Sequence, residues 1–380
     1  MKANPRLLYL DPISYTGLAY YSYSFLEALS SGGRSVVYGH SEGWLLSSKP
    51  RTFDAECLYR GVSGSRSRER KGLSYLRSTL RVLGHVFRQR YSMVHLGYVH
   101  IAWVDLILVI ALRVFGRHVV VTVHEVEDVG ANGRGRSVRS WLARAASTVI
   151  VQNHETRRAM LAAGVRAERL VLMPPGGYEY YDDPSITRST ARESLGLPPT
   201  QLVVLCFGSL TARKDVRLLL EAFSDDRVRA AEGSLHVVGR AVSGYDLTAD
   251  LDFVEALGLS ETVTFKPEFV SVHEAECWYK AADLLVLPYT SICESAVLRQ
   301  AFTYGCPTIV SALPELADAV VDGDNCLLYE VGDARELSDR IVDVLTDPQK
   351  RDRLGSRAAE TMTAEGSWAA AVRRVEHVYS

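Results

Sequence analysis

Short apolar runs alternate with helical stretches along almost the whole chain, and this alternation restricts the fold more than any other feature. Runs of this kind are typical of parallel β-strands that are buried on both faces. Joined by helices, they predict βαβ units and therefore an α/β fold. The runs are residues 7–10, 35–38, 93–96, 118–123, 148–151 and 170–173 in the first half, and 202–207, 235–238, 263–266, 284–287, 308–310 and 326–329 in the second.

A stretch rich in Pro, Gly, Tyr and Asp, residues 174–199, interrupts the alternation and reads as a linker. A chain of 380 residues also exceeds one ordinary hydrophobic core. We therefore expect two doubly wound, Rossmann-like domains, residues 1–180 and residues 181–365. A C-terminal helix over residues 366–380 would then be free to cross back to the first domain. Two such domains place an active site in the cleft between them.

The composition is that of a globular protein, with 47% hydrophobic and 23% charged residues. The apolar run at the start is too short for a signal peptide, and the longest apolar stretch, residues 106–112, is far below a membrane span. Six cysteines show neither a CxxC pair nor a zinc spacing. These features predict a cytoplasmic protein with reduced thiols.

Net charge differs sharply between the two halves. Residues 1–180 contain 24 Lys and Arg against 13 Asp and Glu, whereas residues 181–380 contain 19 against 32. The first half therefore has a surplus of positive charge, which indicates that it faces something anionic.

The loop that follows residues 202–207 is a candidate anion site. Gly208 permits a tight turn, and Arg213 and Lys214 stand just before a helix, where they are able to neutralise a diphosphate. The alternative is that both cations are solvated on a surface loop, as basic loop residues commonly are.

A second loop, after residues 284–287, runs into another helix near Ser295 and Ala296. Small residues at a helix N-terminus let a phosphate approach the backbone N–H groups. Glu294 and Gln300 are polar side chains able to bond the hydroxyls of a ribose or sugar, and Glu315 is a further candidate, although it more readily begins a surface helix. The alternative here is an ordinary βα loop.

Four segments together resemble the donor domain of family 4 glycosyltransferases of the GT-B fold. They are Gly208 with Lys214, then YKAADLLVLPY, ESAVLRQAFTYGCPTIVS and DGDNCLLYEVGDARELSDRI. The resemblance implies an enzyme that transfers a sugar from a nucleotide-diphosphate sugar to a carbohydrate or lipid-linked acceptor, with retention. It further implies that Arg213 and Lys214 act in catalysis and that Gly208, Ser209, Ser295 and Val297 bind the donor. No metal and no other cofactor is expected.

The chain departs from the family at several positions. The family commonly has two glutamates eight positions apart, where this chain has Ile292 and Gln300, and Glu294 is displaced by two. Ser209 stands where an Arg is usual. The Ser295-Ala296-Val297 stretch is similar to that of a subset of exopolysaccharide enzymes.

In the first half, the resemblance implies that Gly17, in a loop after the first strand, meets the donor or acceptor. It also implies that His124, at the end of an apolar strand, acts near the donor sugar; a lone His is otherwise more often structural. His95, His100 and Trp103 are candidates for an acceptor pocket.

Residues 66–91 form a basic amphipathic stretch, with Leu73, Leu76, Leu80, Leu83 and Phe87 at helical spacing beside several arginines. Two interpretations are open: a helix packed on its own domain with a solvated basic face, or contact with an anionic membrane at its inner face.

Three functions remain possible from the sequence. Besides sugar transfer, they are epimerisation of a nucleotide sugar on the same fold and a catalytically silent homologue that serves as a scaffold. Nothing indicates a nucleic-acid partner. Asp250 and Asp252 spell the DxD metal motif of another fold, but they lie in a helical acidic stretch rather than at a strand end.

Overall fold

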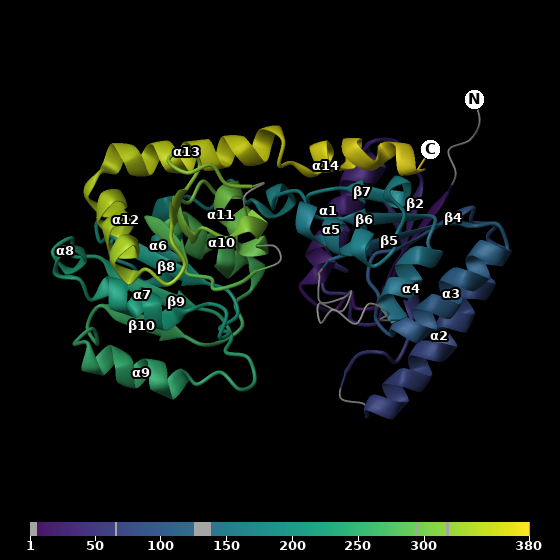
Figure 1. Ribbon diagram of the computed structural model, residues 1–380, viewed down its shortest axis with the longest axis horizontal. Coiled ribbons are helices and arrows are strands. Elements are labelled where there is room, and N and C mark those ends of the chain that lie inside the picture. The colour runs from purple at the N-terminus through teal and green to yellow at the C-terminus, as the bar shows by residue number, and fades with distance from the viewer. Residues whose placement is uncertain (1–5, 65–66, 125–137, 293–294, 317–318, 380) are drawn as a thin grey trace. The chain divides into compact units, whose positions relative to one another are not determined.

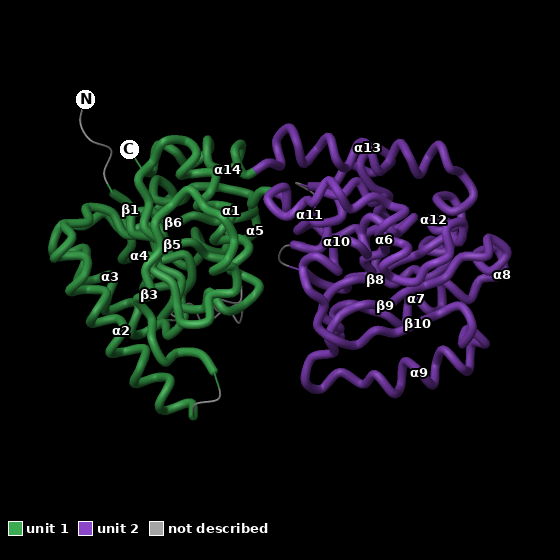
Figure 2. Tube along the Cα trace, turned by 180° about the vertical axis from the view of Figure 1, so that it is seen from behind, with its two compact units in different colours: residues 1–176, 368–380 green, residues 177–367 purple. Residues whose placement is uncertain are grey.

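The computed structural model contains two parallel β-sheets, each covered by helices (Figure 1). It describes residues 6–64, 67–124, 138–292, 295–316 and 319–379. The chain divides into two compact units (Figure 2): unit 1 is residues 1–176 with 368–380, and unit 2 is residues 177–367.

Unit 1 contains a seven-stranded sheet in the order β3-β2-β1-β4-β5-β6-β7, with every pair parallel. Its strands are β1 (Leu7–Asp11), β2 (Val36–Ser41), β3 (Asp54–Tyr59), β4 (Met93–Leu96), β5 (His118–Val123), β6 (Thr148–Val151) and β7 (Leu170–Leu172). All were expected from the sequence except β3. This edge strand is buried only at Leu58 and Tyr59, so it lacks the continuous apolar run of the central strands.

The helices of unit 1 pack on both faces of this sheet. They are α1 (Leu18–Ser31), α2 (Arg68–Arg88), α3 (Ala102–Val114), α4 (Val138–Ala145), α5 (His154–Ala162), η2 (Ala167–Arg169), α14 (Trp368–Val375) and η5 (Glu376–Tyr379). The C-terminal α14 packs against α1, and Trp368 lies so close to Gly176 that a Cβ on Gly176 would be 2.4 Å from its ring.

Unit 2 contains a six-stranded parallel sheet in the order β10-β9-β8-β11-β12-β13. Its strands are β8 (Val203–Phe207), β9 (Ser234–Val238), β10 (Val263–Lys266), β11 (Leu284–Leu287), β12 (Thr308–Ser311) and β13 (Leu327–Tyr329). Its helices are η3 (Glu179–Tyr181), α6 (Arg188–Leu195), α7 (Val216–Phe223), α8 (Asp226–Arg229), α9 (Leu247–Ala256), α10 (Val272–Ala281), α11 (Ala296–Thr303), η4 (Pro314–Leu316), α12 (Ala334–Thr346) and α13 (Pro348–Ala364).

Both sheets are Rossmann-like, and each has one point where the strand order reverses. In unit 1 this point lies between β1 and β4, and in unit 2 between β8 and β11. Loops that leave the carboxyl ends of such neighbouring strands diverge and leave room for a ligand. In the part of the chain that the structure describes, no helix has the length and hydrophobicity needed to cross a bilayer.

Candidate functional site

The loop after β8 is fixed by close backbone contacts. The Gly208 N–H donates to the carbonyl of Val238 at 2.9 Å, and the Leu210 N–H donates to that of Arg240 at 3.0 Å. Gly208 has φ +102°, which favours glycine, and a Cβ on Gly239 would lie 2.3 Å from the carbonyl oxygen of Gly208. Glycines at both positions therefore let the loops after β8 and β9 touch.

Lys214 is a buried cation at this edge of the sheet. Only 2% of its surface is exposed. Its ammonium donates to the carbonyl of Phe207 and lies 5.7 Å from the centroid of the Tyr289 ring. Burial holds the pKa of Lys214 below its ordinary value. No carboxylate among the described residues pairs with it, and a buried cation of this kind gains most from an anionic ligand.

The N-terminus of α11 supplies hydrogen-bond donors to the same site. Ser295 caps the helix and its Oγ accepts the N–H of Leu298 at 3.0 Å. Within the described residues, the N–H groups of Ala296 and Val297 have no acceptor, as is usual in a first helical turn. Ala296 is exposed, so these donors and the positive end of the helix dipole are open to an anion.

Gly208 lies between Lys214 and α11. A Cβ on Gly208 would be 3.0 Å from Lys214 Nζ and 3.0 Å from Val297 Cγ2. The two loops are also tied together, because the Thr290 N–H donates to the carbonyl of Arg213 at 2.8 Å. Two segments far apart in the sequence, the loop after β8 and the start of α11, thus converge at the switch point of unit 2 and form a candidate anion site.

The remaining predicted donor residues differ in their surroundings. Arg213 and Ser209 are exposed at the rim of the loop. Gln300 lies on the second turn of α11, where its Oε1 accepts the Tyr279 hydroxyl at 2.8 Å and leaves its amide N–H groups available to a ligand. Glu294 lies outside the described residues. Ile292, which replaces a family glutamate, packs on the apolar core.

Glu315 does not begin a surface α-helix as expected; it lies in the short η4. One of its carboxylate oxygens is buried and has no hydrogen-bond partner among the described residues.

In unit 1, His124 follows β5 and is held by two hydrogen bonds. Its Nε2 is 2.8 Å from the carbonyl oxygen of Gly97, and its Nδ1 is 2.9 Å from the side-chain amide of Gln152. Because a carbonyl only accepts, Nε2 carries the proton and Nδ1 accepts from Gln152. The imidazole is 9% exposed, and the Tyr21 ring packs edge-on against it at 4.8 Å. Sequence reasoning missed Gln152, although its place directly after β6, the neighbour of β5, was a usable signal.

Gly17 begins α1 with an ordinary φ of −58°, and nothing lies within 4 Å of where its Cβ would be. The expected acceptor pocket is wrong for His95, which is fully buried between Thr122 Oγ1 at 2.8 Å and the Tyr379 hydroxyl at 2.9 Å. This burial lowers the pKa of His95 to about 3. His95 is therefore a core residue, because β4 lies in the middle of the sheet.

Two further residues at the carboxyl edges escaped the sequence reasoning. Asp11 ends β1 and is buried, and it accepts hydrogen bonds from Ser22 Oγ at 2.8 Å and the Tyr38 hydroxyl at 2.9 Å; burial raises its pKa. Phe269 follows β10 and is 69% exposed, an unusual degree for an aromatic side chain. A charged residue that ends an apolar strand was the available signal for Asp11.

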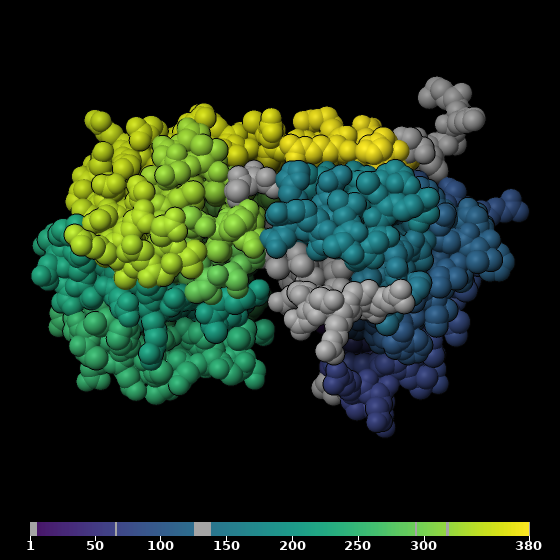
Figure 3. All heavy atoms as spheres, in the orientation of Figure 1, coloured from purple at the N-terminus to yellow at the C-terminus, as the bar shows by residue number. Residues whose placement is uncertain are grey.

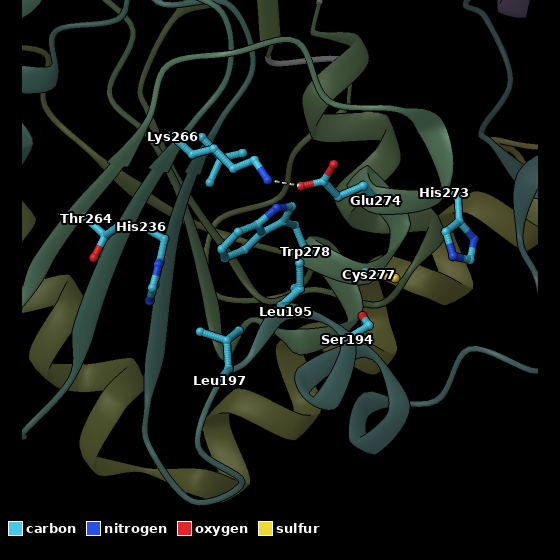
Figure 4. Close-up of a pocket in the computed structure, with 11 residues that line it drawn as sticks. Ser194, Leu195, Leu197, His236, Thr264, Lys266, His273, Glu274, Cys277 and Trp278 are labelled. Carbon is cyan, nitrogen blue, oxygen red and sulfur yellow. Dashed lines mark hydrogen bonds and ion pairs between the residues drawn. The ribbon is translucent and has the colours of Figure 1, made fainter.

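A separate cavity of about 440 Å³ lies over β9 and β10 in unit 2 (Figure 4). Trp278 lies beneath the Lys266–Glu274 ion pair, beside His236, whose ring centroid is 5.2 Å away. None of the predicted donor residues lines this cavity, so it is distinct from the anion site at Lys214.

The DxD sequence of Asp250 and Asp252 belongs to α9, where Asp250 has a structural role. Asp250 is buried, accepts the Tyr245 hydroxyl and faces Arg217 at 3.5 Å. The residues that the structure describes contain no group of His, Cys, Asp and Glu side chains able to hold a metal ion.

Comparisons with known proteins match both halves of the chain to glycosyltransferase families. The family described as "Glycosyl transferases group 1" matches residues 187–361, and "Glycosyl transferase 4-like domain" matches residues 16–176. The D-inositol 3-phosphate glycosyltransferase of Corynebacterium aurimucosum is 29% identical over 243 residues, which cover 61% of this chain and 56% of the relative. That of Streptomyces bingchenggensis is 30% identical over 223 residues, covering 57% and 49%. The chain therefore aligns with about half the length of these curated relatives.

Solved structures match over nearly the whole chain. HepE from Anabaena, in complex with UDP-glucose, superposes with a TM-score of 0.75 at 20% identity and covers 98% of both chains. Sucrose-phosphate synthase from Thermosynechococcus elongatus gives a TM-score of 0.72 at 20% identity and covers 99% of this chain and 98% of that one. These structural likenesses establish the two-domain GT-B fold.

Proposed function

Because the chain belongs to the family 4-like glycosyltransferases of the GT-B fold, we propose that it transfers a sugar from a nucleotide-diphosphate sugar to an acceptor hydroxyl. The observation that carries the proposal is the convergence of Lys214, Gly208 and the N-terminus of α11 on one anion site. The family resemblance supports retention of anomeric configuration.

The chemistry follows from charge. When the glycosidic bond of the donor breaks, the leaving diphosphate gains negative charge next to the Lys214 ammonium and the N–H groups of Ala296 and Val297. Donors and cations that are already in place stabilise this charge without reorganisation. Arg213, exposed at the rim, adds a weaker attraction that salt screens. Fixed cations and the helix dipole thus supply what a metal supplies elsewhere, and we propose that no metal is required.

Gln300 binds a hydroxyl of the ribose or of the sugar through its free amide N–H groups. Its orientation is set by the Tyr279 hydroxyl, which occupies Oε1. A neutral amide replaces the family's carboxylate here, so it donates a hydrogen bond where a glutamate accepts one.

Unit 1 binds the acceptor, which we propose to be a carbohydrate or a lipid-linked glycan at the cytoplasmic face of a membrane. Gly17, around which space is open, lies on this acceptor side. His124 acts there too. Since both of its ring nitrogens already have partners, it must exchange one hydrogen bond to touch a substrate. Contact of residues 66–91 with an anionic membrane surface belongs to the same proposal.

A thermal-shift screen with UDP, GDP, ADP and their glucose conjugates tests the donor site. HepE was solved with UDP-glucose, so we expect the largest stabilisation with a uridine nucleotide. The Lys214→Met variant should lose the shift. A flat response of the wild-type protein to every nucleotide would contradict the proposal, and donor consumption without any acceptor would indicate epimerisation or hydrolysis instead of transfer.

A further inference from the structure

One face of α3 is apolar and uncovered. Trp103, Ile107, Ile110 and Val114 recur at helical spacing along it, and they are 55%, 60%, 47% and 76% exposed. The opposite face of the same helix packs Val104, Leu108 and Leu112 into the core. A helix that is apolar all round is usually buried on every side, so an exposed apolar stripe of this length needs a covering partner.

The leucine stripe of α2 also faces outward. Its residues Leu73, Leu76 and Leu80 are exposed, whereas Tyr75, Ser78, Thr79, Val82 and Val86 make the buried face. α2 does pack on its own domain with a solvated basic face, but Leu73, Leu76 and Leu80 lie outside that contact. The buried face is set by Tyr75, whose hydroxyl donates to the buried Asp105 of α3.

The two stripes form one surface. α2 and α3 are neighbours in both views of the chain (Figures 1 and 2), and their ends join where the Phe87 and Phe115 rings meet edge-on at 4.9 Å. Next to α3, α4 presents Trp141, which is 48% exposed and stacks under the Arg144 guanidinium at 4.0 Å. Figure 3 shows the blue atoms of α2 and α3 at the surface of unit 1.

Positive charge surrounds this surface. Residues 68–117 contain nine Lys and Arg against only two Asp and Glu, and one of these two, Asp105, is buried. Arg77, Arg81 and Arg113 are exposed beside the stripes. A second copy of the same surface would bring arginines against arginines, whereas anionic headgroups complement them and acyl chains cover the apolar side chains.

We propose that the outward face of α2 and α3, with Trp141 of α4, inserts into an anionic lipid monolayer. The apolar stripes enter the acyl region, Trp103 and Trp141 take interfacial positions, and the arginines pair with headgroup phosphates. This deepens the proposed membrane contact by assigning the insertion to α3, a helix outside residues 66–91. It does not depend on donor binding, which belongs to unit 2.

Vesicle co-sedimentation of the full chain tests the assignment. We expect binding to vesicles of phosphatidylcholine with about one third phosphatidylglycerol, and little binding to phosphatidylcholine alone. Ile107→Ser with Ile110→Ser should weaken binding at least about tenfold, because two buried aliphatic side chains are lost from the acyl region. Arg77→Gln with Arg81→Gln should weaken it by a smaller factor and reduce its dependence on salt. Brominated lipid should quench Trp103 in a Trp141→Phe variant.

The matched control is Leu251→Ser with Val321→Ser, which removes two exposed apolar side chains from unit 2 and should leave binding unchanged. Failure of the wild-type chain to bind anionic vesicles would overturn the proposal. So would equal binding by the Ile107/Ile110 variant, or a shift of that variant from dimer to monomer in light scattering, which would assign the surface to a second copy. The nucleotide thermal shift of each variant should stay at the wild-type value, so loss of vesicle binding is separable from loss of the donor site.

Discussion

At the carboxyl edge of the unit 2 sheet, Lys214 bonds a single carbonyl and the first N–H groups of α11 have no described acceptor. At the corresponding edge of the unit 1 sheet, Asp11 accepts from two hydroxyls and His124 uses both ring nitrogens. Both edges come from the same Rossmann-like strand order. They differ in whether the polar atoms at the edge already have hydrogen-bond partners within the protein.

The comparison teaches that the strand order fixes where a site lies, but not whether its polar groups are available to a ligand. The unit 2 edge is preorganised for an anion, since its donors and cation need not exchange partners to bind one. The unit 1 edge is a closed hydrogen-bond network, and such a network positions side chains rigidly but must open before it touches a substrate. We therefore expect substitutions at the unit 2 edge to lower turnover directly, through lost stabilisation of the leaving group, and substitutions at the unit 1 edge to lower it less, through lost order in the network.

The largest effect is expected from Lys214→Met, which removes the cation and keeps most of the volume. Turnover should fall by about a hundred- to a thousandfold, because one preorganised charge at the leaving group is lost. The thermal midpoint should not fall, since an uncompensated buried charge is removed as well. Sugar transfer and thermal unfolding measure the two effects.

Lys350→Met is the matched control for Lys214→Met. Lys350 is a lysine of α13 that pairs with Asp343 at 3.0 Å, away from the anion site, and its loss should leave transfer unchanged. Full activity of the Lys214→Met protein would contradict the proposal that Lys214 stabilises the leaving diphosphate.

A smaller effect, about ten- to a hundredfold on turnover, is expected from His124→Ala, because misplacement of a group near the reacting centre costs that much. Donor affinity should stay unchanged, since His124 belongs to unit 1. Gln152→Leu should act in the same direction and less strongly, because it removes only the hydrogen bond that orients the imidazole. Steady-state kinetics with separate donor binding would decide, and unaltered turnover in both variants would make this network purely structural.

The pH dependence of stability gives a third test, on two buried titratable groups of unit 1. His95 has a pKa of about 3 in the fold, below the unfolded value of about 6.5, so it stabilises above that value and its contribution is lost as the pH falls. Asp105 acts oppositely, since burial raises its pKa to about 6 and its contribution is lost as the pH rises through that value. In the wild-type chain the two contributions partly cancel between pH 4 and 6.

His95→Gln removes only one side of this balance. Between pH 7 and pH 5 the wild-type chain should lose about 2 kcal/mol of unfolding free energy because His95 stays neutral in the fold, at about 1.4 kcal/mol per pH unit below the unfolded pKa. The variant should not show this loss. Urea unfolding at the two pH values measures it. Equal pH slopes for the variant and the wild-type chain would show that His95 is not held neutral.

The smallest effect is expected from Arg213→Ala. Its exposed guanidinium is screened by solvent, so donor affinity should fall about two- to fivefold at low salt and by less at high salt. Isothermal titration at two ionic strengths tests this. A loss of donor affinity as large as that of Lys214→Met would show that the buried Lys214 contributes no more to donor binding than the exposed Arg213.

Much of the fold is readable from the sequence because central parallel strands are buried on both faces. The runs Met93–Leu96, Thr148–Val151 and Leu284–Leu287 coincide with β4, β6 and β11. The edge strand β3 escaped because one side of it meets solvent, which breaks its apolar run. Gly208 and Lys214 were also predicted from the sequence. They belong to one short loop, so a tight turn and a cation beside a helix start can be recognised there without knowledge of distant contacts.

Tertiary structure alone decided the rest. Gly208 lies against Val297 of α11 only because β8 and β11 are neighbours, and no spacing in the chain states that pairing. The same holds for the ring of His124, which Gln152 and Gly97 orient from two other strands. Leu73, Leu76 and Leu80 of α2 point outward because Tyr75 and Val82 occupy the contact with the core. The sequence by itself determined every described strand except the edge strand β3, and which residues are able to bind an anion. Burial and pairing across the sheets decided which of those residues are available, because availability depends on neighbours that are distant in the chain.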